Sequence, residues 1–182
     1  MEPVRFQGVR LLLVLAAFLA VASASAADVR DADRFFNLNT GDLKAEAGDA
    51  KRAGKKAILI MFEQDGCPGC LYMKTNVLNR ADVQKFYRER FVNFPADIYG
   101  AVPIRDFAGR DHTEKSYAQA LRVNATPTFV FFDPDGNEAA RIVGPVKDAA
   151  EFLLLGEFVA SGAYRSTRFT EYKQSRRKER GS

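Results

Sequence analysis

The chain has 182 residues, of which 47% are hydrophobic and 27% are charged. Its 27 Lys and Arg residues outnumber its 23 Asp and Glu residues, which gives a formal charge of +4 and a pI of about 9.1. This composition favours one globular domain over a disordered chain, and two Cys and one His exclude a disulfide-dense scaffold and a four-ligand structural zinc site.

The amino terminus has the pattern of a secretory signal peptide. Arg5 and Arg10 precede a run without charges over residues 11–27, and small residues close it at 24–26 with an Ala-x-Ala site. The strongly apolar part, residues 11–22, is shorter than the roughly 20 residues of a membrane-spanning helix. We predict that residues 1–26 are a cleaved signal peptide for export to the periplasm. The alternative is an uncleaved anchor that leaves the domain facing the periplasm.

Hydrophobic periodicity and turn residues then predict alternating helices and strands. In chain order these are a helix at 42–53, a strand at 56–62, helices at 67–78 and 81–90, a strand at 91–98, a long loop at 99–113, a helix at 114–122, strands at 128–133 and 137–143, and a helix at 147–161. Asp42 is the expected N-cap of the first helix, and Pro95 places its strand at a sheet edge or a bulge. This order predicts an α/β sandwich with a hairpin near its end.

The chemistry concentrates in Cys67-Pro68-Gly69-Cys70, which follows an apolar strand and opens a predicted helix. At a helix start, free backbone N–H groups and the helix dipole stabilise a thiolate, and thiol pKa values there fall to roughly 3.5–7.5. Cys67 is therefore the predicted nucleophile and Cys70 the resolving thiol. Three other roles of this motif are disfavoured. A zinc site would need a second Cys/His pair, and a c-type haem site would need His in place of Leu71. A purely structural disulfide at this spacing would contribute little stability.

Two further features make a resemblance specific. Thr126-Pro127 opens the third predicted strand, and Gly144 follows the fourth. Together with the Cys-x-x-Cys motif they resemble the thioredoxin superfamily over residues 55–161, and the runs FEQDGCPGC and ATPTFVFFD are similar to the SoxW family, the periplasmic thioredoxins of sulfur-oxidation operons. The resemblance implies a three-layer α/β/α sandwich with a mixed central sheet, and a cis-proline at Pro127. It also implies that the Thr126 backbone pairs with an extended substrate segment, and that the substrate-binding residues are Pro68, Gly69, Thr126, Pro127 and Gly144.

Two positions depart from that family. Met61 stands where cytoplasmic thioredoxins have a buried Asp, and Gly66 stands where they have a Trp before the first Cys. Another group or water must therefore carry the proton of Cys70. Glu63 is the candidate base, against the alternative that it is a solvated acid, and Asp65 is a weaker candidate.

The resemblance implies a periplasmic thiol–disulfide oxidoreductase that reduces protein disulfides. Its substrate would be a protein disulfide, for example in a sulfur-carrier protein, and its electrons would come from a membrane thiol-relay protein. It implies no cofactor, no metal and no nucleic-acid partner, and we expect the mature form to be a soluble monomer. The alternatives are a disulfide oxidase or isomerase, and a binding module or chaperone without turnover. Pro68 and Gly69 supply no charge to the thiolate, which argues against a very strong oxidant.

The charge divides unevenly along the chain. Residues 165–182 carry a net charge of +5, and the thioredoxin-like domain over residues 27–164 carries −2. We predict a basic, flexible tail over residues 165–182 that is simply solvated, with contact to anionic lipid or an acidic partner as alternatives. His112 lies in the predicted long loop and is interpreted as a solvated residue, unless that loop folds over the active site.

Overall fold

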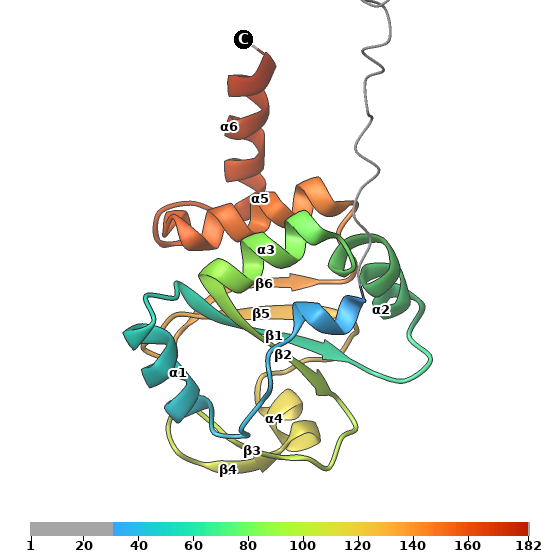
Figure 1. The fold of residues 1–182 in the computed structure, drawn as a ribbon, viewed down its shortest axis with the longest axis vertical. Coiled ribbons are helices and arrows are strands. Elements are labelled where there is room, and N and C mark those ends of the chain that lie inside the picture. Colours follow the sequence, from blue (N-terminus) through green and yellow to red (C-terminus); the bar gives the residue numbers. More distant parts are fainter. Residues whose placement is uncertain (1–30, 182) are drawn as a thin grey trace, which may run out of the picture.

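The computed structural model describes residues 31–181, with side chains placed for residues 31–179; the predicted signal peptide lies outside the described residues. A four-stranded sheet in the order β2-β1-β5-β6 forms the centre of the fold (Figure 1). The strands are β1 (Ala57–Glu63), β2 (Phe91–Asp97), β5 (Thr128–Phe132) and β6 (Glu138–Val143). β1 pairs in parallel with β2 and antiparallel with β5, and β5 pairs antiparallel with β6, so the sheet is mixed as predicted.

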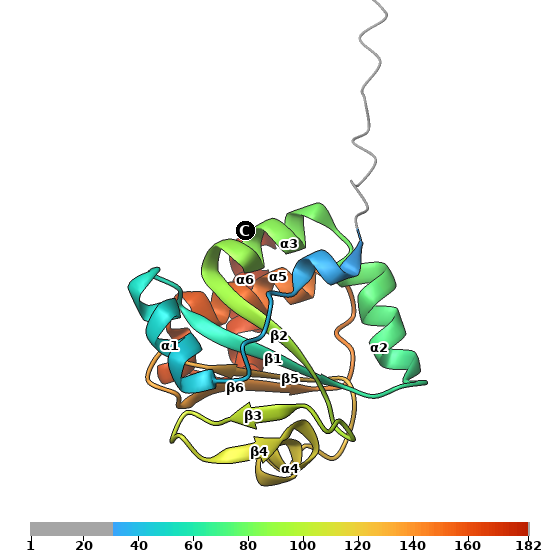
Figure 2. The same cartoon turned by 60° about the horizontal axis from the view of Figure 1, so that its bottom comes forward.

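Helices cover both faces of this sheet (Figure 2). They are α2 (Pro68–Met73), α3 (Ala81–Arg90) and α5 (Ala149–Ala160) on one face, and α1 (Leu43–Arg52) and α4 (Glu114–Ala120) on the other. β1 is buried from Ala57 to Phe62, because alternate side chains enter the two cores. Leu59 and Met61 pack under α3 and α5, whereas Ile60 packs toward α1 and α4. This arrangement confirms the predicted α/β/α layers.

Local sequence signals explain several helix boundaries. The carboxylate of Asp42 accepts a hydrogen bond from the amide of Ala45 at 2.9 Å, so Asp42 is the N-cap of α1 as predicted. The predicted helix at 67–78 begins as α2 and continues as a π-helical turn over Lys74–Leu78. Pro95 lies in β2, an edge strand of the sheet, where a missing N–H is tolerated. A short 3₁₀ helix, Ala32–Phe35, precedes α1 and buries Phe35 in the core.

The long loop predicted over residues 99–113 is wrong in its middle. A two-stranded hairpin forms there from β3 (Pro103–Arg105) and β4 (Asp111–Thr113), beside α4 (Figure 2). Strands of three residues leave no readable alternation in the sequence. The hairpin also contacts the segment just before α1, because the Arg105 amide donates to the Gly41 carbonyl at 2.6 Å.

The flexible tail predicted over residues 165–182 is also corrected. After a 3₁₀ turn at Ala163–Arg165, the chain forms helix α6 (Phe169–Gly181), which crosses α5 and projects away from the sheet (Figure 1). Two rings anchor it: Phe169 and Tyr172 lie with their centroids 5.6 and 5.3 Å from that of Phe158 in α5. Charge alone indicated a solvated tail, whereas this aromatic contact orders the segment. Within residues 31–181, no helix is both long enough and apolar enough to span a membrane.

Candidate active site

Cys67 and Cys70 form a disulfide at the start of α2. Cys67 is the N-cap residue of α2, and its Sγ accepts a hydrogen bond from the amide of Cys70 at 3.1 Å. Gly66 has a φ of 68°, a left-handed conformation that glycine adopts readily, and it turns the chain from β1 into the helix. Both cysteines are buried, with 8% of Cys67 and 4% of Cys70 exposed.

The Cys-x-x-Cys segment packs against the loop that precedes β5. The Thr126–Pro127 peptide bond is cis. A β-carbon added to Gly69 would lie 2.9 Å from Cδ of Pro127 and 3.4 Å from Cδ of Pro145, which shows how closely the segment approaches these two rings. The amide of Gly144 donates to the Pro127 carbonyl at 2.8 Å. The fold therefore brings Gly69, Pro127 and Gly144 together.

Thr126 and Pro68 lie at the outer side of this arrangement. Pro68 is exposed and Thr126 is half-buried. Among the described residues, the backbone of Thr126 has no hydrogen-bond partner, while the next hydroxyl, that of Thr128, donates to the Ala125 carbonyl at 2.6 Å. The backbone of Thr126 is thus available to a further strand, next to Pro127, on which the Cys-x-x-Cys segment packs.

Glu63 ends β1 and forms an ion pair that the sequence did not reveal. Its Oε2 lies 2.7 Å from Nζ of Lys74, which stands one helical turn after Cys70. Glu63 is 20% exposed in its side chain, so it is neither fully buried nor freely solvated. Asp65 is exposed, and its Oδ1 accepts a hydrogen bond from the Gly66 amide at 2.9 Å, which stabilises the turn. The structure therefore ties Glu63, rather than Asp65, to the helix that carries the two cysteines.

Two further carboxylates lie near Glu63. Asp97 is its register partner on β2, and the Asp97 amide donates to Oε1 of Glu114 at 3.3 Å. Burial raises the pKa of the Glu114 carboxyl, and the negative charges of Asp97 and Glu63 raise it further. The sequence offered no signal for Glu114, because the α4 start and the end of β2 meet only in the tertiary structure.

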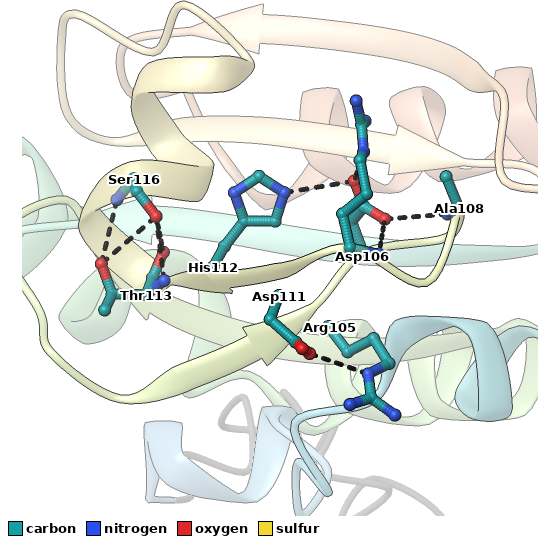
Figure 3. A network of polar contacts seen from close by, with 8 residues as sticks. Arg105, Asp106, Ala108, Asp111, His112, Thr113 and Ser116 are labelled. Carbon is teal, nitrogen blue, oxygen red and sulfur yellow. Dashed lines mark hydrogen bonds and ion pairs between the residues drawn. The ribbon is translucent and has the colours of Figure 1, made fainter.

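His112 belongs to the hairpin and takes no part in this site (Figure 3). Its Nε2 lies 3.2 Å from Oδ2 of Asp106, which also accepts a bond from Nε of Arg110 at 2.7 Å. Burial acts to raise the pKa of Asp106, but hydrogen bonds from the Arg110 amide, the Arg110 guanidinium and His112 outweigh it and hold that pKa below its ordinary value. The His112 ring also packs on Tyr117 of α4. The solvated-loop interpretation was wrong, because the imidazole is largely buried and helps close the hairpin.

Exposed apolar side chains flank the disulfide on its own helix and on the last strand. Leu71 and Tyr72 follow Cys70 directly, and 62% and 38% of them are exposed; Val143 at the end of β6 is 62% exposed. The hydroxyl of Tyr72 donates to the Lys147 carbonyl at 2.5 Å. Such side chains suit contact with another polypeptide better than contact with water. Within residues 31–181, no group of three or more His, Cys, Asp or Glu side chains is placed to hold a metal ion.

Comparisons with known proteins agree with this geometry. Residues 43–160 match the model of a family described as a thioredoxin-like domain. A thioredoxin-fold protein from Helicobacter pylori superposes with a TM-score of 0.63 at 21% identity, over 81% of this chain and 90% of that one. A thioredoxin from Thermus thermophilus gives 0.50 at 28% identity, over 63% and 82%, and a DsbH oxidoreductase gives 0.53 at 17%, over 69% and 85%. No curated protein matches the chain significantly in sequence.

Proposed function

Because the chain belongs to the thioredoxin-like domain family and is a thiol–disulfide oxidoreductase, we propose that it works in the periplasm as a reductase of protein disulfides. One observation carries this proposal. The Cys67–Cys70 disulfide stands at a helix start, against Pro127 and beside an unpaired stretch of backbone at Thr126. Export rests on the signal-peptide pattern of residues 1–26.

The reaction needs only the two thiols and a substrate disulfide. The thiolate of Cys67 attacks one substrate sulfur and forms a mixed disulfide, while the other substrate sulfur leaves as a thiolate and takes up a proton. Cys70 then loses its proton and attacks Sγ of Cys67, which releases the second substrate thiol. The enzyme ends as the Cys67–Cys70 disulfide, and two electrons have passed to the substrate. A membrane thiol-relay protein would restore the dithiol, because the periplasm has no reducing buffer.

The helix start supports Cys67 as the nucleophile. In the disulfide its Sγ already receives the Cys70 amide hydrogen at 3.1 Å, and the same donor would face a Cys67 thiolate after reduction. The first turn of a helix also places a partial positive charge there. Both effects favour the thiolate form, which is the reactive one.

Substrate backbone would pair with Thr126 by β-augmentation. The Thr126 amide and carbonyl have no partner within residues 31–181, and Gly69 and Gly144 add no side chain that would obstruct an approaching strand. Pro68 is exposed at the edge of this groove. We assign substrate contact to Pro68, Gly69, Thr126, Pro127 and Gly144 on these grounds.

We further propose that Glu63 accepts the proton of Cys70 during resolution, and that Lys74 holds the carboxylate in position through the 2.7 Å ion pair. Glu63→Gln should slow resolution of the mixed disulfide about 100-fold, the usual scale for losing a positioned general base. Lys74→Met should slow it less and change its pH profile. Asp65→Asn is the matched control, because Asp65 only stabilises the turn; equal rates in all three variants would overturn the assignment.

Two measurements test whether the chain is a disulfide reductase. They are the reduction of insulin disulfides with dithiothreitol and the equilibrium reduction potential of the Cys67/Cys70 pair. Cys67→Ser should abolish turnover, and Cys70→Ser should accumulate a mixed disulfide that identifies the substrate. A sulfur-carrier protein whose cysteine bears sulfur intermediates is the first partner we would look for, from the similarity to the SoxW family. A potential as oxidising as that of known disulfide oxidases, about −120 mV, would favour the oxidase alternative. If neither the wild type nor the cysteine variants show turnover, and the variants bind partners as the wild type does, the chain would be a binding module.

A further inference from the structure

Helix α6 lies outside residues 43–160, which match the thioredoxin-like family, and it creates a cavity that the fold would otherwise lack. The cavity has a volume of about 220 Å³ and lies in the angle between α5 and α6. Its lining holds four cations and two acids: Lys147, Lys173, Arg176, Arg177, Asp148 and Glu151. The disulfide reaction described above uses none of these side chains.

Each acid in this cavity has an internal partner, although only Glu151 is paired with a cation. Asp148 is the N-cap of α5, where its Oδ1 accepts a hydrogen bond from the Glu151 amide at 2.9 Å. Glu151 pairs with Nζ of Lys173 at 2.7 Å. Lys147 and Arg177 are exposed, and neither forms an ion pair with another residue of the described part of the chain. The six charged side chains of the lining thus sum to +2, and Lys147 and Arg177 are the cations that remain open to a ligand from outside.

The same loop forms one wall of the cavity and one side of the dithiol. Tyr72, two residues after Cys70, donates from its hydroxyl to the Lys147 carbonyl at 2.5 Å. Pro145, two residues before Lys147, packs against Gly69, with 3.4 Å between its Cδ and a β-carbon placed there. A protein that presents a disulfide to Cys67 would thus come close to the loop that lines the cavity.

We propose that this cavity docks an acidic segment of the protein whose disulfide the chain reduces, with carboxylates of that segment on Lys147 and Arg177. The proposal rests on the function proposed above. A protein fits better than a lipid surface for two reasons. The site is a hollow between two helices, and the aromatic residues of α6, Phe169 and Tyr172, already pack on Phe158, so they are not available to insert into a bilayer.

The test uses one disulfide-bridged peptide made in three forms, carrying a run of four Glu, four Gln or four Lys. The wild-type chain should reduce the Glu form with a kcat/KM about fivefold above that of the Gln form at low ionic strength. The preference should fall in about 0.5 M NaCl, where charges are screened within a few ångströms. Lys147→Gln combined with Arg177→Gln should remove the preference and leave reduction of the Gln form unchanged. Equal rates for the Glu and Gln forms with wild type would overturn the proposal.

A charge-matched control separates local docking from net charge. Lys44 and Lys56 are exposed cations of α1 and of the segment before β1, away from α5 and α6. The double variant Lys44→Gln with Lys56→Gln should keep the preference for the Glu peptide over the Gln peptide. Loss of this preference in the double variant would show that the overall charge of the chain, and not the cavity, determines it. Peptides with Ser in place of both Cys, measured by fluorescence anisotropy, report docking even if the chain reduces nothing. Loss of binding to anionic vesicles in the cavity variant, with peptide preference intact, would instead assign the surface to lipid.

Discussion

The contact between Gly69 and the two proline rings gives a quantitative prediction for Gly69→Ala. The new β-carbon would lie 2.9 Å from Cδ of Pro127 and 3.4 Å from Cδ of Pro145. Real β-carbons do not tolerate the shorter distance, and ring atoms of proline cannot rotate away as the end of a flexible side chain can. The Cys-x-x-Cys segment must therefore move away from Pro127, or the loop before β5 must move.

The expected loss follows from two opposing contributions. Alanine in place of glycine in a helix gains up to about 1 kcal/mol in helix propensity. Forcing an extra methyl into a packed contact costs typically about 1–3 kcal/mol. With the full helix gain subtracted, Gly69→Ala should destabilise the chain by up to about 2 kcal/mol. Displacing the dithiol from Pro127 should also lower kcat/KM for disulfide reduction about tenfold, since reacting groups depend on close positioning.

Gly48→Ala is the matched control. Gly48 lies inside α1, and the nearest atom to its new β-carbon is Nη1 of Arg52 at 3.4 Å, at the end of a flexible side chain. That variant should gain about 0.5–1 kcal/mol and keep full activity. Urea unfolding at constant m-value and insulin reduction measure the two quantities for both variants. If Gly69→Ala were as stable and as active as Gly48→Ala, the close packing of the motif on Pro127 would be refuted.

Three further changes test the packing around the site. Tyr87→Phe should lower the free energy of unfolding by about 1–2 kcal/mol, because the buried hydroxyl donates to the Phe152 carbonyl at 2.7 Å; an unchanged urea midpoint would contradict this. Asp106 has a lowered pKa in the folded chain, so its stabilising contribution is complete above its unfolded pKa of about 3.9 and is lost as pH falls through the folded value. In Asp106→Asn, the free energy of unfolding should therefore decrease less between about pH 5 and pH 2 than in the wild type, and identical pH dependence in the two proteins would contradict this prediction. Tyr172→Ala should cost about 1–3 kcal/mol and increase proteolysis within α6 by removing a ring packed on Phe158, whereas a flexible tail would show neither effect.

The sequence determined the redox motif and most of the sheet. The continuous apolar run of β1 and the TFVFF run of β5 are fully buried strands because each is apolar on both faces, a signal that needs no knowledge of neighbours. Cys67 at the helix start and Asp42 at the α1 cap are equally local, since each satisfies amides within three residues of itself.

The tertiary structure decided the features that depend on distant partners. The Glu63–Lys74 ion pair, the contact of Gly69 with Pro127 and the order of α6 each join segments that local periodicity treats separately. The β3–β4 hairpin is similar, because its three-residue strands pair with each other and the Asp106 carboxylate binds Arg110 and His112, contacts that no alternating pattern announces. Composition showed how much positive charge the end of the chain carries. The packing of Phe169 and Tyr172 on Phe158 orders this segment as a helix, because burying two aromatic rings offsets the entropy lost on ordering. The ordered helix places its positive charges around a basic cavity beside the dithiol.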